Sequence, residues 1–348
     1  MGWRIEGNHV IPQPSLRFVE KLPKGTYYLR YNEMAQSYYL EKVEDFKLPK
    51  KIYGDCSVVD RWIKGYKNNE RNTGVLLSGI KGGGKTLLSK KLAIDSDLPV
   101  VIIDQPYEDT NFVSFITNPE LGDICVFIDE FEKIYNDRDT ESGLLSILDG
   151  SFKTHNLFVF TCNQMNVSKY LINRPSRIRY RTHFESLDQS VINEVIDDLL
   201  EDKTQKDSIF TVLDLIGIVT YDILISLIRE MNLFKESAIK VAQYLNLKSE
   251  EFTVTCYELW DGQRVELEYK YATLYPDSDV NLYRDFDKNR NIKGYYRLKR
   301  NDEGEFIGLP GNIEVPRSSI KKVSQNKWES KTELGHFVFE RKFATYLF

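Results

Sequence analysis

The sequence predicts an α/β fold in which a central domain with a parallel sheet is followed by a small helical unit and a β-rich C-terminal domain. From residue 74, apolar strand patterns alternate with helical patterns, and near-continuous apolar strands are typical of a parallel sheet covered on both faces. Residues 185–248 carry apolar pairs at helical spacing, which indicates helices. After about residue 250, short runs alternate apolar and polar residues, and this pattern favours strands.

The composition predicts a folded, soluble protein. A chain of 348 residues is longer than one ordinary core requires, so we expect two or three units. No stretch approaches the 18 or so uninterrupted apolar residues of a membrane span. The N-terminal residues lack a basic start followed by an apolar run, so we expect a cytoplasmic protein.

The net charge and the cysteine positions give no sign of general nucleic-acid binding, a zinc site or a disulfide framework. The net charge of −5 gives no general attraction to nucleic acid and allows only a local basic patch. The cysteines are scattered, with neither zinc-site nor disulfide-framework spacing, at Cys56, Cys125, Cys162 and Cys256.

Residues 1–48 are expected to form a small N-terminal hairpin, which would serve as a short docking or capping element. Two aromatic-rich runs, 26–31 and 37–40, are separated by the turn-like residues 32–36. A segment punctuated by Pro49 and Gly54 then enters the central domain, for which we expect residues 49–184.

The central domain is expected to contain a regular succession of elements. Helices are predicted at 58–66, from 85, near 111–116 and near 141–148, and strands at 75–78, 100–104, 124–129, 157–161 and 178–183. Residues 185–249 are expected to be helical. Residues 250–348 are expected to be β-rich, with turns at Asp261-Gly and Glu303-Gly.

A glycine-rich loop follows the first central strand and opens a helix. It fits the phosphate-binding pattern GxxxxGK[ST] and consists of Gly79, Ile80, Lys81, Gly82, Gly83, Gly84, Lys85 and Thr86. Glycines let backbone N–H groups surround phosphates, Lys85 would reach the β- and γ-phosphates of ATP, and the Thr86 hydroxyl would bind Mg²⁺. The alternative is a flexible glycine-rich turn with a solvated lysine.

Two carboxylates end the strand at 124–129. Asp129 would hold Mg²⁺, and Glu130 would orient and polarise the water that attacks the γ-phosphate. Alone, two acids after a strand are more often a polar strand end. Their position about 43 residues after Lys85 favours the catalytic interpretation.

Together with later motifs, the chain resembles the AAA ATPases. The loop and the acid pair are followed by Leu144-Leu-Ser-Ile-Leu-Asp-Gly150, Thr161-Cys-Asn163 and Arg174-Pro-Ser-Arg177. The resemblance covers about residues 49–248. The short segment 105–123 is similar to the branch that contains the mitochondrial Rieske-protein translocase, and large phage genomes encode similar proteins, for which the location would be the host cytoplasm.

This resemblance implies roles for further residues. Asn163 would help to position the attacking water, and Arg174 and Arg177 would reach the γ-phosphate of an adjacent subunit in a ring, usually of six. Leu87 would adjoin the phosphates, while Tyr53 and Gly54, with Ile52, would pack the adenine base. The helical unit would be a lid over the nucleotide. Alternatively, Asn163 would only end a strand, the two arginines would be solvated loop residues, and residues 52–54 would make an ordinary linker contact.

Some residues depart from the family pattern. Ser176 replaces the usual glycine between the arginines, and Arg179 and Arg181 extend the basic strand, so the principal arginine is left open. The segment after the second central strand lacks the aromatic loop of polypeptide-threading rings. Tyr107 could serve there, or could simply pack against the next helix.

The work done with ATP is left open between two classes. One is the remodelling or assembly of a protein partner; the other is a nucleic-acid motor or loader that uses basic and aromatic residues between Tyr283 and Arg300. Residues 250–348 contain 16 Lys and Arg against 17 Asp and Glu, so the protein-directed class is preferred. A structural ring in which ATP only controls assembly is a third possibility.

Overall fold

The fold is taken from a computed structural model. It describes residues 2–6, 9–13, 19, 21–135, 138–149, 152–163, 174, 176–245, 247, 251–260, 263–274, 279–283, 299–300, 306–307, 312–324, 326–332 and 335–341. The chain divides into two compact units, residues 1–185 and 186–348, each considered by itself.

The first unit contains the predicted parallel sheet, with seven strands. The strand order is β4-β3-β6-β7-β8-β5-β9. All neighbours run parallel except β4, which is antiparallel to β3. The strands are β3 (Thr26–Asn32), β4 (Ser37–Val43), β5 (Thr73–Gly79), β6 (Val100–Ile102), β7 (Cys125–Ile128), β8 (Leu157–Cys162) and β9 (Tyr180–Phe184).

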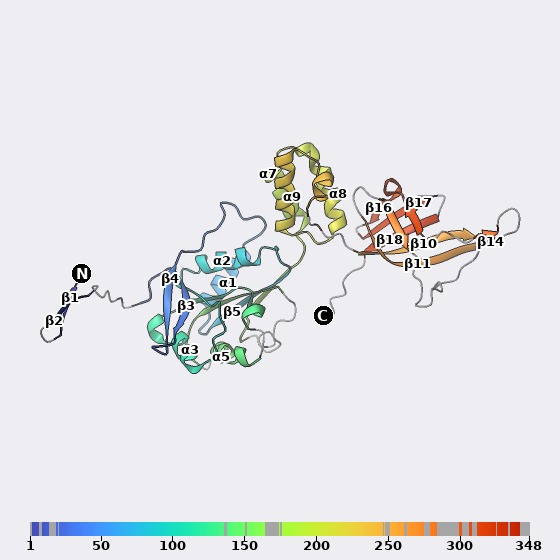
Figure 1. The fold of residues 1–348 in the computed structure, drawn as a ribbon. Coiled ribbons are helices and arrows are strands. Elements are labelled where there is room, and N and C mark those ends of the chain that lie inside the picture. Colours follow the sequence, from blue (N-terminus) through green and yellow to red (C-terminus); the bar gives the residue numbers. More distant parts are fainter. Residues whose placement is uncertain are drawn as a thin grey trace. The chain divides into compact units, whose positions relative to one another are not determined.

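Helices cover both faces of this sheet, as its apolar strands require (Figure 1). Along β7, Cys125 and Phe127 pack into one core while Val126 and Ile128 pack into the other. The first core holds α1 (Val58–Lys67) and α2 (Lys85–Asp95), and the second holds α3 (Thr110–Ile116) and α5 (Arg138–Leu148). The short η1 (Pro119–Leu121) and α4 (Phe131–Ile134) complete this unit's helices within the described residues.

The N-terminal hairpin β3–β4 belongs to this sheet. The two aromatic-rich runs predict a separate small element, but β3 pairs in parallel with β6, with Thr26 opposite Val100. Leu29 and Tyr38 are buried in the core beneath α3 and α5. A two-stranded hairpin is at best marginally stable in water. Here β6 pairs with its edge, and the core covers its apolar side chains. An additional hairpin, β1 (Gly2–Glu6) and β2 (His9–Gln13), precedes it.

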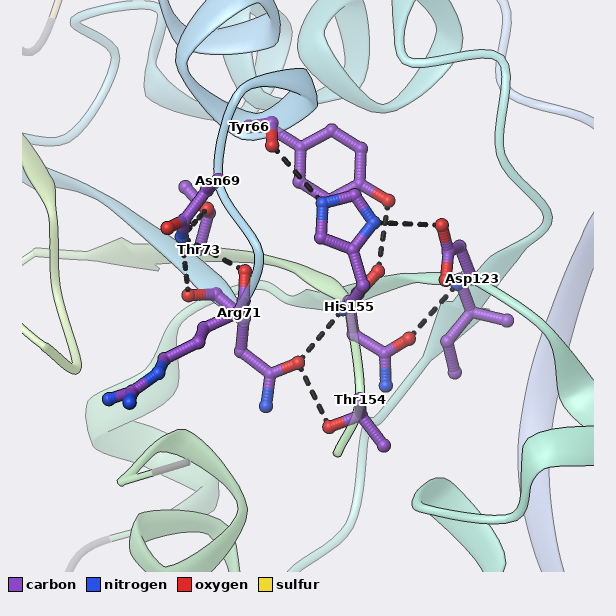
Figure 2. A network of polar contacts seen from close by, with 10 residues as sticks. Tyr66, Asn69, Arg71, Thr73, Asp123, Thr154 and His155 are labelled. Atoms are coloured by element: carbon purple, nitrogen blue, oxygen red, sulfur yellow. Dashed lines mark hydrogen bonds and ion pairs between the residues drawn. The ribbon is translucent and has the colours of Figure 1, made fainter. Parts of the chain in front are cut away.

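A polar network lies at the amino ends of the central strands (Figure 2). The His155 ring stacks on the Tyr66 ring, and its Nδ1 lies 2.8 Å from Asp123. The Tyr66 hydroxyl donates to the His155 carbonyl at 2.9 Å. These contacts fasten the end of α1 to the starts of β7 and β8.

Asn72 extends this network to α5. Its side-chain oxygen accepts hydrogen bonds from the Thr154 hydroxyl at 3.0 Å and from the Asn156 N–H at 2.8 Å. Its amide group donates to the Ile147 carbonyl at 2.9 Å. Asn72 is 4% exposed, so the protein rather than water satisfies its polar atoms.

The second unit joins a helical part to a β part. The helical part contains α7 (Gln189–Leu199), η2 (Lys203–Gln205), α8 (Lys206–Ile216), α9 (Tyr221–Phe234) and α10 (Ala238–Ala242). In the β part, an antiparallel sheet has the order β11-β10-β18-β17-β16. Its strands are β10 (Glu251–Trp260), β11 (Gln263–Thr273), β16 (Lys321–Ser324), β17 (Lys327–Thr332) and β18 (Gly335–Arg341).

Smaller pairings complete the β part and confirm its β-rich character. β12 (Val280–Tyr283) pairs with β15 (Asn312–Val315), β13 (Lys299–Arg300) pairs with β14 (Phe306–Ile307), and η3 (Arg317–Ser319) precedes β16. Most of the basic-aromatic stretch, residues 284–298, and both predicted turns lie outside the described residues. Within the described ranges, no helix combines the length and apolar character needed to cross a bilayer.

Candidate active site

The glycine-rich loop connects β5 to α2 at the carboxyl edge of the sheet. Gly79, Gly82 and Gly84 have φ values of 128°, 72° and 94°, a region that side chains with a Cβ rarely adopt. A Cβ on Gly79 would lie 2.0 Å from the Phe184 carbonyl oxygen. The loop therefore has the sharp, close-packed backbone that a phosphate-binding loop needs.

Lys85 begins α2 and is held beneath this loop. It is 5% exposed, and its Nζ donates to the carbonyl oxygens of Gly79 at 3.0 Å and Ile80 at 2.5 Å. Burial lowers the pKa of Lys85, while nearby carboxylates, chiefly Glu132, oppose that shift. An anionic ligand in the loop would meet a cation that has little competing solvent.

Thr86 and Asp129 come together from different elements. The Thr86 hydroxyl lies 3.1 Å from Asp129 Oδ1, although the residues are 43 positions apart in the chain. The contact arises because β7 and β5 flank β8, so their carboxyl ends meet at one edge of the sheet. A hydroxyl and a carboxylate are oxygen ligands of the kind that Mg²⁺ accepts beside phosphate oxygens.

Glu130 is held toward the end of β8. The Asn163 amide group donates to its carboxylate at 2.8 Å, and Lys133 forms an ion pair with it. The Lys133 contact, with a smaller contribution from Asn163, lowers the pKa of Glu130. Glu130 is thus kept ionised, as a residue that polarises water must be.

Two nearby residues take part in the site although the sequence patterns assigned them no role. The buried Thr161 hydroxyl contacts Asp129 and accepts a hydrogen bond from the Glu130 N–H at 2.8 Å. The Glu132 carboxylate accepts from the Asn163 N–H at 3.0 Å. A polar residue within the apolar run 157–162, beside the strand that carries the acids, was the available signal for Thr161.

The donor set fits ATP with Mg²⁺. The loop offers glycine backbone at positions that a Cβ would block, and it leads into a helix N-terminus, whose first N–H groups and dipole favour phosphate. Beside the loop, Thr86 and Asp129 supply a hydroxyl and a carboxylate oxygen that could bind Mg²⁺. ATP and Mg²⁺ therefore suit the residues that the fold gathers here.

The two arginines have different surroundings. Arg177 is buried and binds Asp149 through two hydrogen bonds of 2.6 Å. The Arg174 side chain is 63% exposed and lies 3.4 Å from the same carboxylate. Asp149 follows α5, so both arginines are held on this helix end, and Arg174 is the one directed largely to solvent.

The comparisons with known proteins agree with this geometry. Residues 75–186 match the family model described as ATPase family associated with various cellular activities (AAA). That stretch includes the loop, the acid pair, Asn163 and both arginines, and the family supports an ATPase of the AAA+ type. No curated protein matches the chain.

The remaining predicted site residues lie at the start of α2 and before α1. Leu87 is half-buried in the first turn of α2. Tyr53 and Gly54 lie before α1; the Lys51 amine sits 4.8 Å from the Tyr53 ring centroid, and Gly54 has a φ of 83°. Their contact with adenine stays a prediction.

Tyr107 lies in the core of the first unit. It is 7% exposed, its ring is 5.2 Å from that of Tyr38 in an edge-on arrangement, and its hydroxyl donates to the Leu29 carbonyl at 3.1 Å. Tyr107 thus packs against the next helix, α3, where its ring lies 6.0 Å from that of Phe112. Tyr107 in this position offers no aromatic side chain for gripping a polypeptide.

Proposed function

We propose that this protein is an AAA+ ATPase that couples the hydrolysis of Mg·ATP to the remodelling or assembly of a protein partner. The observation that carries the proposal is the meeting of Lys85, Thr86, Asp129, Glu130 and Asn163 at the ends of three adjacent strands. The match to the AAA family supports the same activity.

In this mechanism each group has a physical role. Lys85 and the backbone N–H groups of the loop bind the phosphates of ATP. Thr86 and Asp129 hold Mg²⁺, which would offset phosphate charge when bound. Glu130 would orient the attacking water and accept its proton as the water oxygen attacks the γ-phosphate, and Asn163 holds the Glu130 carboxylate through its amide hydrogen bond.

The remaining positive charge would come from a neighbouring subunit. Exposed Arg174 is the better candidate for this role, because a guanidinium that is mostly in solvent can reach a second molecule. Buried Arg177 would hold the segment that presents Arg174, through its bond to Asp149. The site would then be complete only in an oligomer, for which we propose a ring of six.

A protein partner is favoured over nucleic acid by the charge balance of residues 250–348, with 16 basic against 17 acidic side chains. Because Tyr107 is buried, we propose remodelling through the outer surfaces of the ring rather than by threading. The partner would stimulate ATP hydrolysis, and single-stranded DNA or RNA would not.

The decisive experiment measures ATP turnover in mixtures of inactive variants. Lys85→Ala should not bind ATP, and Arg174→Ala should bind ATP without hydrolysing it. Mixed rings should recover part of the activity, because a Lys85→Ala subunit lends its intact Arg174 to the neighbour's nucleotide.

The matched control mixes Lys85→Ala with Glu130→Gln. Both residues would act within their own subunit, so this mixture should stay inactive. Full activity of a dilute monomer would disprove the shared site, and wild-type turnover equal to that of Glu130→Gln would disprove the ATPase assignment.

A further inference from the structure

Thr161 connects the two acidic residues of the candidate site. It lies on β8, the strand between β5 and β7, and it is 1% exposed. Its hydroxyl donates to Asp129 Oδ1 and accepts from the Glu130 N–H at 2.8 Å. One oxygen atom thus contacts the proposed metal ligand and the backbone of the proposed catalytic residue.

The hydrogen bond to Glu130 acts on an unusual backbone. Glu130 has φ 53° and ψ 53°, the left-handed region that a residue with a side chain adopts at a cost. This conformation turns the chain from β7 into α4, so that the Glu130 side chain meets Asn163. The Thr161 hydroxyl gives the Glu130 N–H a partner that supports the turn.

The contact with Asp129 orients its carboxylate. Asp129 Oδ1 faces the hydroxyls of both Thr86 and Thr161, which approach from α2 and β8. A ligating carboxylate that is fixed by a second hydrogen bond presents its oxygens in one direction, and loss of such a bond commonly weakens metal binding 10- to 100-fold.

We infer that Thr161 is a positioning residue, which sets the carboxylate of Asp129 for Mg²⁺ and the backbone of Glu130 for attack on the γ-phosphate. This inference rests on the proposed ATPase function. One hydroxyl thus links the metal ligand Asp129 to the catalytic residue Glu130. Removal of that hydroxyl should weaken Mg²⁺ binding and slow turnover together.

The test compares three variants of the full chain. Thr161→Val removes the hydroxyl and keeps the side-chain shape, whereas Thr161→Ser keeps the hydroxyl. Thr73→Val is the matched control: Thr73 is also fully buried in this sheet, but its hydroxyl accepts from Asn69 at 2.9 Å, at the amino end of β5.

The first readout is nucleotide binding by calorimetry, with and without Mg²⁺. We expect Thr161→Val to bind ATP normally in EDTA but to lose most of the strengthening that Mg²⁺ gives, needing roughly tenfold more Mg²⁺ for half of the effect. Thr161→Ser should restore the wild-type Mg²⁺ dependence, and Thr73→Val should leave it unchanged.

The second readout is turnover. The kcat of Thr161→Val should fall by roughly ten- to 100-fold with KM for ATP nearly unchanged at saturating Mg²⁺. Wild-type Mg²⁺ dependence and kcat in Thr161→Val would overturn the inference, as would equal losses in Thr73→Val. A wild-type protein without turnover would instead refute the ATPase proposal, and the Mg²⁺-dependent binding would still decide the role of Thr161.

Discussion

Arg174 and Arg177 belong to one sequence motif, yet burial separates them. Arg177 forms a two-bonded ion pair with Asp149, whereas Arg174 is mostly solvated. Removing one partner of a buried ion pair leaves the other charge uncompensated. Substitution of Arg177 should therefore lower stability more than substitution of Arg174.

Arg177→Met should destabilise the first unit, by about 2 kcal/mol, because the Asp149 side chain is 26% exposed and the full cost of a buried pair is not reached. Arg174→Met should leave stability within about 0.5 kcal/mol of wild type. Urea unfolding of both variants checks this. Equal stabilities would show that the Arg177 pair contributes no more than a surface contact.

The difference in stability between wild type and Arg177→Met should depend on pH. Arg177 holds the pKa of Asp149 below its ordinary value, so the pair's contribution is present above the unfolded pKa of about 3.9. It is lost as the pH falls through the lower, folded pKa. Wild type and Arg177→Met should therefore converge in stability in acid, as measured by urea unfolding at a series of pH values.

Lys133 should set the acid limit of turnover. Its ion pair is the largest cause of the lowered pKa of Glu130. Lys133→Gln should raise that pKa, so that Glu130 takes up a proton at a higher pH and kcat begins to fall there. The pH profile of kcat measures this; an unshifted acid limb would show that Glu130 ionisation does not limit turnover.

At the residue level, the sequence predicted what local spacing encodes. The loop from Gly79 to Thr86 and the acids after β7 follow from short patterns in the chain. The burial of Arg177, and the contacts of Thr161 and Glu132, depend on strands that meet only in the folded sheet. No spacing rule specifies those partners.

At the scale of elements, Asn72 fastens β5, β8 and α5 at the amino edge of the sheet. Its side chain makes three hydrogen bonds while almost fully buried. The bond to the Ile147 carbonyl also secures the end of α5, two residues before Asp149. The network therefore supports the helix end on which both arginines are held.

Asn72→Ala should destabilise the first unit by about 2 to 4 kcal/mol, since several buried polar groups lose their partner. Faster amide exchange in β5, β8 and α5, with unchanged exchange in β10 and β18, would localise the effect. The matched control is Asn111→Ala, because Asn111 is exposed on α3. Unchanged protection in Asn72→Ala would show that water replaces the lost bonds.

The fold class and most elements of the sheet were predictable because apolar runs and helical periods are local. The joining of β3 to β6 was not, since the aromatic pattern at residues 26–31 specifies a strand without specifying its neighbour. Pairing is decided by which apolar faces remain to be covered, and Leu29 and Tyr38 join a core that the central strands, α3 and α5 also form.

At the scale of the whole molecule, this pairing extends the sheet that carries the candidate site toward the N-terminus. β6 has three residues and would become an edge strand if the hairpin were absent. Its free N–H and C=O groups, with the uncovered core, would favour aggregation. The resemblance to AAA ATPases begins near residue 49, but the stable domain should need residues from about 21.

Two truncations test this. A chain that lacks residues 1–20 should keep a cooperative thermal transition and bind ATP, since β3 and β4 remain. A chain that lacks residues 1–48 should be insoluble or lose that transition, because it also loses the sheet strands β3 and β4 and the core residues Leu29 and Tyr38. Light scattering and calorimetry compare them directly. If both truncated chains fold equally well, the β3–β4 hairpin is not needed for the stability of the sheet. If only the longer truncation fails, β3 and β4 are part of the fold that positions the nucleotide site.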